Sequence, residues 1–349
     1  MESANKHFGL DTADWQRRLA GHWLEAWLGL PSETPSHARL LLPGCELLSY
    51  GGEGPPVLIL PAPIKRPYIW DLFPEASAVR RLLQNGFSVH LLRWTEETVD
   101  TGAGLDFFTI AGPAEAFRRL RAGTPRSRVI LAGHSLGGLF AAMTACLFPD
   151  GISGLVLIEA PLAFSGHRLG SAAKQGPLLQ PLLRGQLTGT ALSALSVALM
   201  PDEFIWRRWH DAALACGDPH RMRIHLGVLR WALDEFPLPS PLVMELLAAM
   251  AEDAFVSGEL CLGGQAIGPA AIRCPMLAVT CASGLTPLHA LTPFFEKCTK
   301  AEARVIQFPA ETGTALAHVS PLVGPAAQVQ LWPQIADWAR EVHGEERGR

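Results

Sequence analysis

The sequence predicts a doubly wound α/β fold, in which helices cover both faces of a mostly parallel sheet and a helical lid is inserted between two of the strands. Short apolar runs rich in β-branched residues alternate with helical patterns. These runs are apolar at successive positions, as in strands that are buried on both faces of a parallel sheet. The long segment 164–264 has no convincing strand pattern, which indicates an insertion over the carboxyl ends of the strands.

The expected elements follow one another in the order that this architecture needs. Trp15, Leu19, Trp23 and Trp27 lie at helical spacing near the N-terminus, and we expect these side chains to pack onto the main domain. Strands are expected at 57–60, 88–92, 128–132, 155–158, 276–279 and 304–308, and helices at 14–28, 74–85, 111–122, 136–147 and 327–342. The predicted division is an N-terminal helical segment (1–50), a core (51–163 and 265–343) and a helical lid (164–264).

Composition excludes several classes of function. The 349 residues carry 29 Lys and Arg against 33 Asp and Glu, so there is no basic surplus to neutralise the phosphates of a nucleic acid. With 48% apolar and 18% charged residues the chain is not disordered, yet its apolar runs are too short for a membrane span. The N-terminus is polar, and the seven cysteines form no C-x-x-C pair. We expect a cytoplasmic protein with neither metal nor cofactor.

The strongest local signal is the segment 133–138, GHSLGG, which follows the expected strand 128–132 and precedes a helical pattern. This is the G-x-S-x-G nucleophile elbow in its strand–turn–helix context, typical of the α/β-hydrolase fold. The turn is so tight that side chains at Gly133 and Gly137 would collide with their neighbours. We therefore expect Ser135 to be the nucleophile, with the amide of Leu136 directed at a developing oxyanion.

A serine nucleophile needs a base, which in this fold comes late in the chain. Of the twelve histidines, His318 lies between the last expected strand and the last expected helix, which is the position of the base. His134 lies within the elbow and cannot easily reach the neighbouring hydroxyl. For His220, His225 and His289 we expect surface or capping roles.

The acid that would orient the base is harder to place. The loop after the penultimate strand, 281–287, contains no carboxylate. Glu159, at the end of the strand that follows the nucleophile helix, could orient His318 from a displaced position. Two other interpretations stay open: Glu159 bonds a backbone amide or an arginine, or Ser135 and His318 act as a dyad.

A second oxyanion donor is expected from the loop after the strand 57–60. Pro61 and Pro63 in this loop have no N–H, which leaves Ala62 and Ile64 as the candidates.

The stretch 60–72, LPAPIKRPYIWDL, resembles the proline loop and the Tyr-Ile-x-Asp-Leu segment of the polyhydroxyalkanoate synthases. The segments 237–239 and 331–338, together with Trp231, extend the resemblance over most of 57–340. It implies an α/β-hydrolase fold and acyl transfer. The length of the chain is similar to that of the short synthase subunits, which work with a partner subunit.

Two positions depart from that family. The synthases carry cysteine where this chain has Ser135, and aspartate where it has Ser283. A thiolate is the better nucleophile toward thioesters, whereas a serine with an adjacent base suits acyl-enzyme formation followed by attack of water or an alcohol.

The first interpretation is therefore a serine-dependent hydrolase or acyltransferase, such as a thioesterase or esterase. Its substrate would be an acyl or hydroxyacyl thioester or ester. The sequence does not distinguish coenzyme A from a carrier protein as the group that carries the acyl chain. A polyhydroxyalkanoate synthase-type polymerase subunit and a catalytically idle partner protein of the same fold are the alternatives. No nucleic-acid partner is expected, and both a homodimer and a partner subunit stay open.

Overall fold

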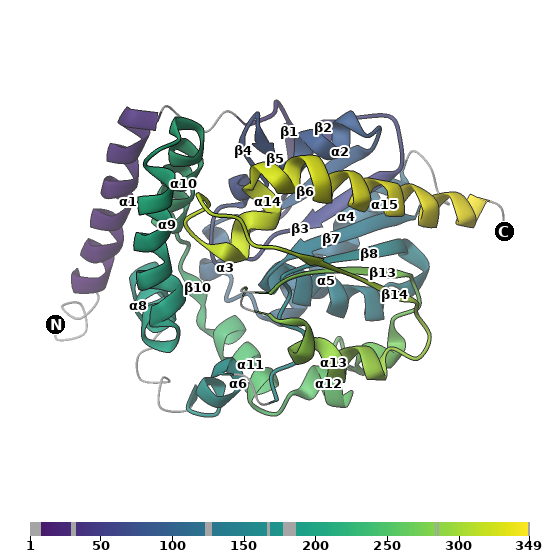
Figure 1. The fold of residues 1–349 in the computed structure, drawn as a ribbon. Coiled ribbons are helices and arrows are strands. Elements are labelled where there is room, and N and C mark those ends of the chain that lie inside the picture. The colour runs from purple at the N-terminus through teal and green to yellow at the C-terminus, as the bar shows by residue number, and fades with distance from the viewer. Residues whose placement is uncertain are drawn as a thin grey trace.

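An eight-stranded sheet runs through the computed structural model, which describes residues 8–28, 33–122, 128–165, 168–176, 186–282, 284 and 286–347 (Figure 1). The strand order is β1-β2-β6-β3-β7-β8-β13-β14. The pairs from β6 to β14 are parallel, whereas β1 and β2 add an antiparallel edge. The bounds of the strands are β1 His37–Leu42, β2 Cys45–Gly51, β3 Pro56–Leu60, β6 Ser88–Trp94, β7 Val129–His134, β8 Ile152–Ile158, β13 Met276–Cys281 and β14 Ala303–Phe308. The predicted fold class and all six predicted strands are confirmed.

The N-terminal part of the chain differs from the prediction. The expectation of a helical segment over 1–50 holds only for α1 (Phe8–Leu28), because β1 and β2 join the main sheet. Four of the six residues of β1 are exposed, so this edge strand lacks the continuous apolar run by which the buried strands were recognised.

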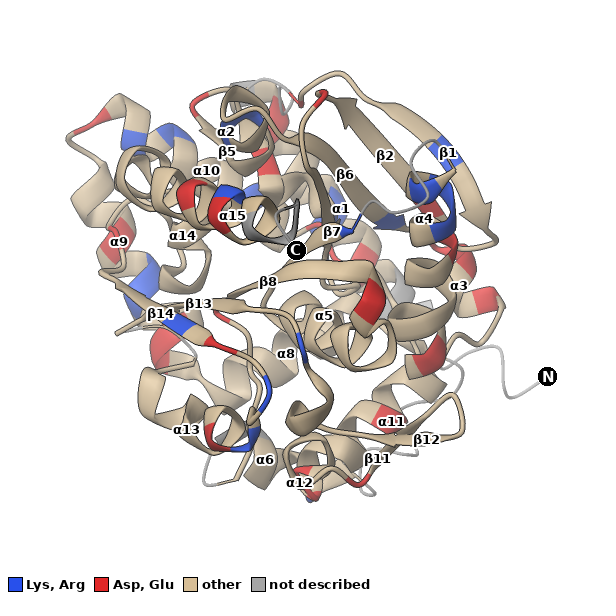
Figure 2. Ribbon diagram, turned by 90° about the vertical axis from the view of Figure 1, so that its right-hand side faces the viewer, with Lys and Arg blue, Asp and Glu red and all other residues tan. Residues whose placement is uncertain are grey.

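Helices cover both faces of the sheet, as a doubly wound fold requires. Side chains of β3 alternate between two apolar cores: Leu58 and Leu60 belong to one, with Phe140 of the nucleophile helix, and Ile59 belongs to the other, with Trp338 of the last helix. The covering helices are α2 Ala78–Gln84, α4 Gly112–Arg121, α5 Leu136–Leu147, α13 Leu288–Lys297, α14 Ser320–Val323 and α15 Trp332–Arg347. The short helix α3 (Glu97–Asp100) follows β6, and β4 (Asp71–Phe73) pairs with β5 (Ala76–Ser77). The central strands β3, β7, β8 and β13 carry no charged residue. Figure 2 shows this for β7, β8 and β13.

A largely helical segment connects β8 to β13. Its elements are α6 Arg168–Ala173, β9 Gln186–Leu187, α8 Gly189–Leu199, the π-helical turn η5 Asp202–Trp206, α9 Arg207–Ala215, α10 Pro219–Ala232, β10 Leu238–Pro239, α11 Ser240–Ala251, α12 Ala254–Ser257 and β11 Leu260–Leu262, followed by β12 Gln265–Ile267. The short pairs β9–β10 and β11–β12 were not predicted. Residues 178–179 and 182–183, which the helical prediction used, lie outside the described residues. We call this segment the lid and propose that it forms the separate unit predicted for 164–264.

The N-terminal helix packs against the lid rather than the sheet. α1 contacts α8 and α10 and stands beside them at the left of Figure 1. The expectation that its tryptophans pack onto the main domain is wrong for Trp15 and Trp23, whose exposed fractions are 62% and 68%. The side chain of Trp27 lies outside the described residues. None of the helices in the described part of the chain combines the length and the hydropathy that a membrane crossing needs.

Candidate active site

Ser135 occupies a sharp turn between β7 and α5. Its backbone angles, φ 56° and ψ −132°, belong to a conformation that non-glycine residues rarely adopt. A Cβ on Gly133 would lie 2.4 Å from the carbonyl oxygen of Gly137, and a Cβ on Gly137 would lie 2.2 Å from the carbonyl oxygen of Leu60. Both positions must therefore be glycine, so the elbow has the geometry that the motif predicted.

The amides of Leu136 and Ala62, two of the predicted oxyanion donors, lie at or directly beside the elbow. The amide of Leu136 is the first of α5 and has no acceptor within the helix. The Cβ position of Gly137 lies 2.8 Å from the nitrogen of Ala62, so Ala62 lies directly against the elbow. Ile64 also lines the cavity at the site. We therefore favour Ala62 over Ile64 as the second donor.

His318 lies in a short helical turn between β14 and α14, and it lines the same cavity as Ser135. Its side chain is 12% exposed, and its Nδ1 lies 3.5 Å from Oε2 of Glu159. Burial lowers the pKa of His318 to about 4, so the imidazole is neutral near pH 7 and able to accept a proton.

Glu159 directly follows β8 and is fully buried. Its φ of 47° is unusual for a non-glycine residue and turns the chain at the end of the strand. The carboxylate accepts a hydrogen bond from the amide of Cys281. A Cβ on Gly284 would lie 2.0 Å from Oε2 of Glu159, so the loop in which no acid was found packs directly against this carboxylate. The structure thus brings Glu159 and His318 together; their roles stay predictions.

Two other histidines make contacts that the sequence did not predict. Nε2 of His134 lies 2.9 Å from the carbonyl oxygen of His318, and the two rings are 4.4 Å apart. His225 is buried, which makes the expected surface or capping role wrong, and its Nδ1 lies 2.8 Å from Asp211. The predicted exposure of His220 and His289 is correct.

A cavity of about 300 Å³ joins the candidate residues to the lid. Its apolar wall comes from the lid and from the segment after β3, and includes Leu192, Val197, Met200, Phe204, Ile69 and Trp70. Its polar wall includes Arg17, Lys65, Arg208 and Glu235. Such a cavity accommodates an apolar chain on one side and a polar or charged group on the other. In the described residues, no cluster of three or more histidine, cysteine or acidic side chains could hold a metal ion.

Comparisons with known proteins agree with this geometry. A family profile described as "alpha/beta hydrolase fold" matches residues 55–183. Among solved structures, naproxen esterase from Bacillus subtilis superposes with a TM-score of 0.54 at 13% identity, over 93% of this chain and 98% of the esterase. An esterase from Thermogutta terrifontis has a TM-score of 0.53 at 17% identity, over 88% of this chain and 99% of that one. The chain has the fold that defines the α/β-hydrolase class of enzymes.

Within that class the chain is similar to polyhydroxyalkanoate synthases, as the sequence predicted. It is 24% identical over 292 residues to the poly(3-hydroxyalkanoate) polymerase subunit PhaC of Allochromatium vinosum, covering 82% of this chain and 81% of the relative. It is 25% identical over 294 residues to the PhaC of Haloferax mediterranei, again over 82% of this chain. The match spans 58% of the length of that second relative.

Proposed function

We propose that this chain is a serine-dependent hydrolase or acyltransferase that acts on acyl or hydroxyacyl thioesters or esters through an acyl-enzyme. One observation carries the proposal. Ser135, which lies on a strained elbow, lines the same cavity as His318, and Nδ1 of His318 lies 3.5 Å from Oε2 of Glu159. This is the order of nucleophile, base and acid by which a serine hydroxyl is activated.

The reaction has two halves. His318 takes the proton of Ser135 as the hydroxyl oxygen attacks the substrate carbonyl, and the amides of Leu136 and Ala62 stabilise the oxyanion. As the intermediate collapses, the thiolate or alkoxide leaves and takes the proton from His318. Water or an alcohol then attacks the acyl-enzyme while His318 takes its proton. The bond between the acyl group and the Ser135 oxygen breaks, the acid or ester is released, and the serine oxygen takes the proton back from His318. Glu159 stabilises the imidazolium that forms in each half.

A second candidate function is polymer synthesis. The similarity to PhaC subunits over 82% of the chain favours it, since those relatives are named as polymerase subunits. Serine in place of the cysteine that synthases carry favours release of the acyl group instead. An idle partner protein is the less favoured alternative, because the elbow and His318 are both intact. We propose a cytoplasmic location, which is the one expected from the cysteine pattern of the sequence.

Two measurements test the proposal. Treatment with a fluorophosphonate should add one adduct to the intact protein, mapped to Ser135 and missing in Ser135→Ala. Incubation with hydroxybutyryl-CoA should release free coenzyme A and hydroxybutyrate. Polymer in place of the free acid would favour the synthase, and absence of the Ser135 adduct would contradict a serine mechanism.

A further inference from the structure

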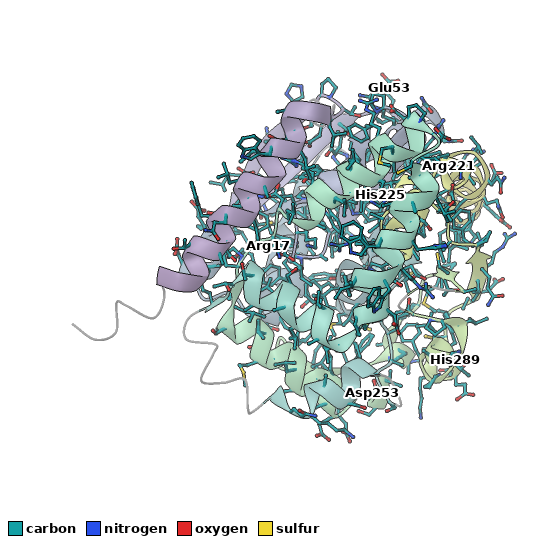
Figure 3. All side chains as sticks on the ribbon, turned by 60° about the vertical axis from the view of Figure 1, so that its left-hand side comes forward. Arg17, Glu53, Arg221, His225, Asp253 and His289 are labelled. Atoms are coloured by element: carbon teal, nitrogen blue, oxygen red, sulfur yellow. The ribbon has the colours of Figure 1, made fainter. Side chains whose placement is uncertain are left out.

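Four cationic side chains and one carboxylate line the cavity, and one of the cations, Arg66, is paired with Glu96 and Asp234 outside the lining. Arg17 comes from α1, Lys65 from the loop after β3, Arg208 from α9 and Glu235 from the segment after α10, and all four line the cavity beside Ser135. Figure 3 shows Arg17 on the side of α1 that faces the lid helices. Three separate parts of the chain thus place positive charge at one location.

Glu235 is fully engaged by two of these cations. Nη2 of Arg17 donates to Oε2 of Glu235 at 2.8 Å, and Nζ of Lys65 donates to Oε1 at 2.8 Å. Arg17 and Lys65 also donate to the carbonyl oxygen of Ala232. Each oxygen of the carboxylate therefore has a cationic donor already, and neither is paired with Arg208.

Arg208, unlike Arg17 and Lys65, is not paired with Glu235. It makes no hydrogen bond or ion pair with any residue that the structure describes, and its Nε is buried without a partner. The nearby acid Glu203 is paired with Arg207 instead, at 3.2 Å. Guanidinium groups that are partly removed from water are normally paired, because an uncompensated charge and unused donors are both costly there.

The surroundings of Arg208 raise that cost. Burial, followed by the charge of Arg17, lowers the pKa of Arg208, and the charges of Glu235 and Glu203 offset this only in part. Burial also lowers the pKa of Lys65 to about 8, although Glu235 favours the charged form. An anion in the cavity would relieve this excess of positive charge, and a planar guanidinium suits carboxylate or phosphate oxygens.

We propose that Arg208, supported by Lys65 and Arg17, binds an anionic oxygen group of the acyl donor, so that the substrates are esters or thioesters that carry a carboxylate or a phosphate. The apolar wall takes the carbon chain between this group and the carbonyl at Ser135. A cavity of about 300 Å³ is at the small end for a ligand site, so it takes a short chain. The carboxylate would be part of the acyl group, whereas the phosphate would be part of the carrier. Turnover of such substrates rests on the proposed function, whereas binding of the anionic group does not.

Binding is tested in Ser135→Ala protein, which cannot form an acyl-enzyme. Calorimetry compares monomethyl glutarate with methyl pentanoate, which has a chain of similar length without the charge. We expect the charged ester to bind at least about tenfold more tightly, as a charge-assisted hydrogen bond gives. Arg208→Met should abolish this preference. Arg207→Met is the matched control, since it removes the same charge from a neighbouring side chain outside the cavity lining, and should keep the preference.

Turnover distinguishes the two sources of the anion. Glutaryl and pentanoyl groups are each offered on N-acetylcysteamine, which is neutral, and on coenzyme A. If the anion is the acyl carboxylate, kcat/KM favours glutaryl on either carrier, and only Arg208→Met loses that preference. If it is a carrier phosphate, kcat/KM favours coenzyme A with either acyl group, and Arg208→Met again loses the preference.

The proposal would be overturned if the two esters bind equally and Arg208→Met changes neither the preference for glutaryl over pentanoyl nor the preference for coenzyme A over N-acetylcysteamine. If Arg208→Met does not fold, judged by its thermal melting, the decision rests on Arg208→Lys and on inhibition of the wild-type enzyme. Glutarate should then inhibit more strongly than pentanoate, and Arg208→Lys should weaken that difference. If the charged ester binds more tightly but the wild-type enzyme turns over none of the substrates, the proposed function is refuted, whereas the anion site is supported.

Discussion

Nδ1 of His225 lies 2.8 Å from Oδ2 of Asp211, and the same carboxylate holds the loop that carries His318. Asp211 accepts hydrogen bonds from the amides of Gly313, at 2.6 Å, and Ala315, at 2.7 Å. Burial raises the pKa of Asp211, but the hydrogen bonds from His225 and the two amides outweigh it and leave the pKa below its usual range. His225, labelled in Figure 3, lies on α10 and Asp211 on α9, so the lid fixes the backbone just before His318.

Asp211→Asn is expected to lower kcat by about tenfold or more while changing KM little, because loss of a buried hydrogen-bond acceptor moves His318 away from Ser135. The amide has one oxygen where the carboxylate had two, so at least one loop N–H loses its acceptor. The rate of fluorophosphonate labelling should fall with kcat, which a change of stability alone would not produce. Asp218→Asn is the control, since Asp218 accepts from the first amides of α10 and does not touch the loop. Equal losses in the two variants would argue against a positioning role for Asp211.

Glu159→Gln is expected to lower kcat by a factor of about 100 to 10,000 with little change in KM, because the imidazolium loses its buried counter-charge and the neutral ring loses its orientation. Steady-state kinetics on an ester and a thioester measure both constants. Glu311→Gln is the control: this partly buried carboxylate accepts hydrogen bonds from the amides of Ala326 and Ala327 and has no hydrogen bond or ion pair with His318. A near-normal rate for Glu159→Gln would leave Ser135 and His318 as a dyad.

The sequence predicted the parts of this protein that depend on local pattern. Buried parallel strands are continuous apolar runs, and the elbow needs glycine at fixed positions, so the central sheet and Ser135 could be found by inspection. His318 was placed from chain order alone. Glu159 could be suggested because a carboxylate that ends an apolar strand is unusual.

The parts that were missed depend on which distant segments meet. The contact between His225 and Asp211 joins two lid helices, and no spacing rule predicts that its carboxylate reaches Ala315. The helical pattern of α1 correctly indicated a helix, but it could not show that Trp15 and Trp23 stay exposed. The unpaired Arg208 is visible only once the partners of Lys65 are known.

The pH dependence of kcat/KM should have its acidic limb near pH 4. His318 must be neutral to accept the proton of Ser135, and burial lowers its pKa to about 4. Activity is therefore expected to persist as the pH falls through 6 and to be lost as His318 becomes protonated at about pH 4. The profile is measured with an ester of constant charge, with stability checked at each pH. An acidic limb near 6.5, the ordinary value for histidine, would contradict this assignment.

The stability of the fold should decrease as the pH falls from about 6.5 to about 4. Burial lowers the pKa of His90, on β6, to about 4, whereas an unfolded chain keeps the ordinary value near 6.5. Between these values the unfolded state binds a proton that the folded state does not, so the free energy of unfolding falls with pH. Below about pH 4 both states are protonated, and this contribution levels off.

His90→Gln separates this contribution from that of the carboxylates. Glutamine can still bond the hydroxyls of Ser49 and Ser88, which lie 3.0 Å from the ring nitrogens of His90, but it does not titrate. Urea unfolding at pH 7 and at pH 4.5 should show a smaller loss of stability for this variant than for the wild type. His220→Gln, which removes an exposed histidine, should lose as much as the wild type. If the two variants respond alike to pH, the buried imidazole of His90 is not the source of the acid sensitivity.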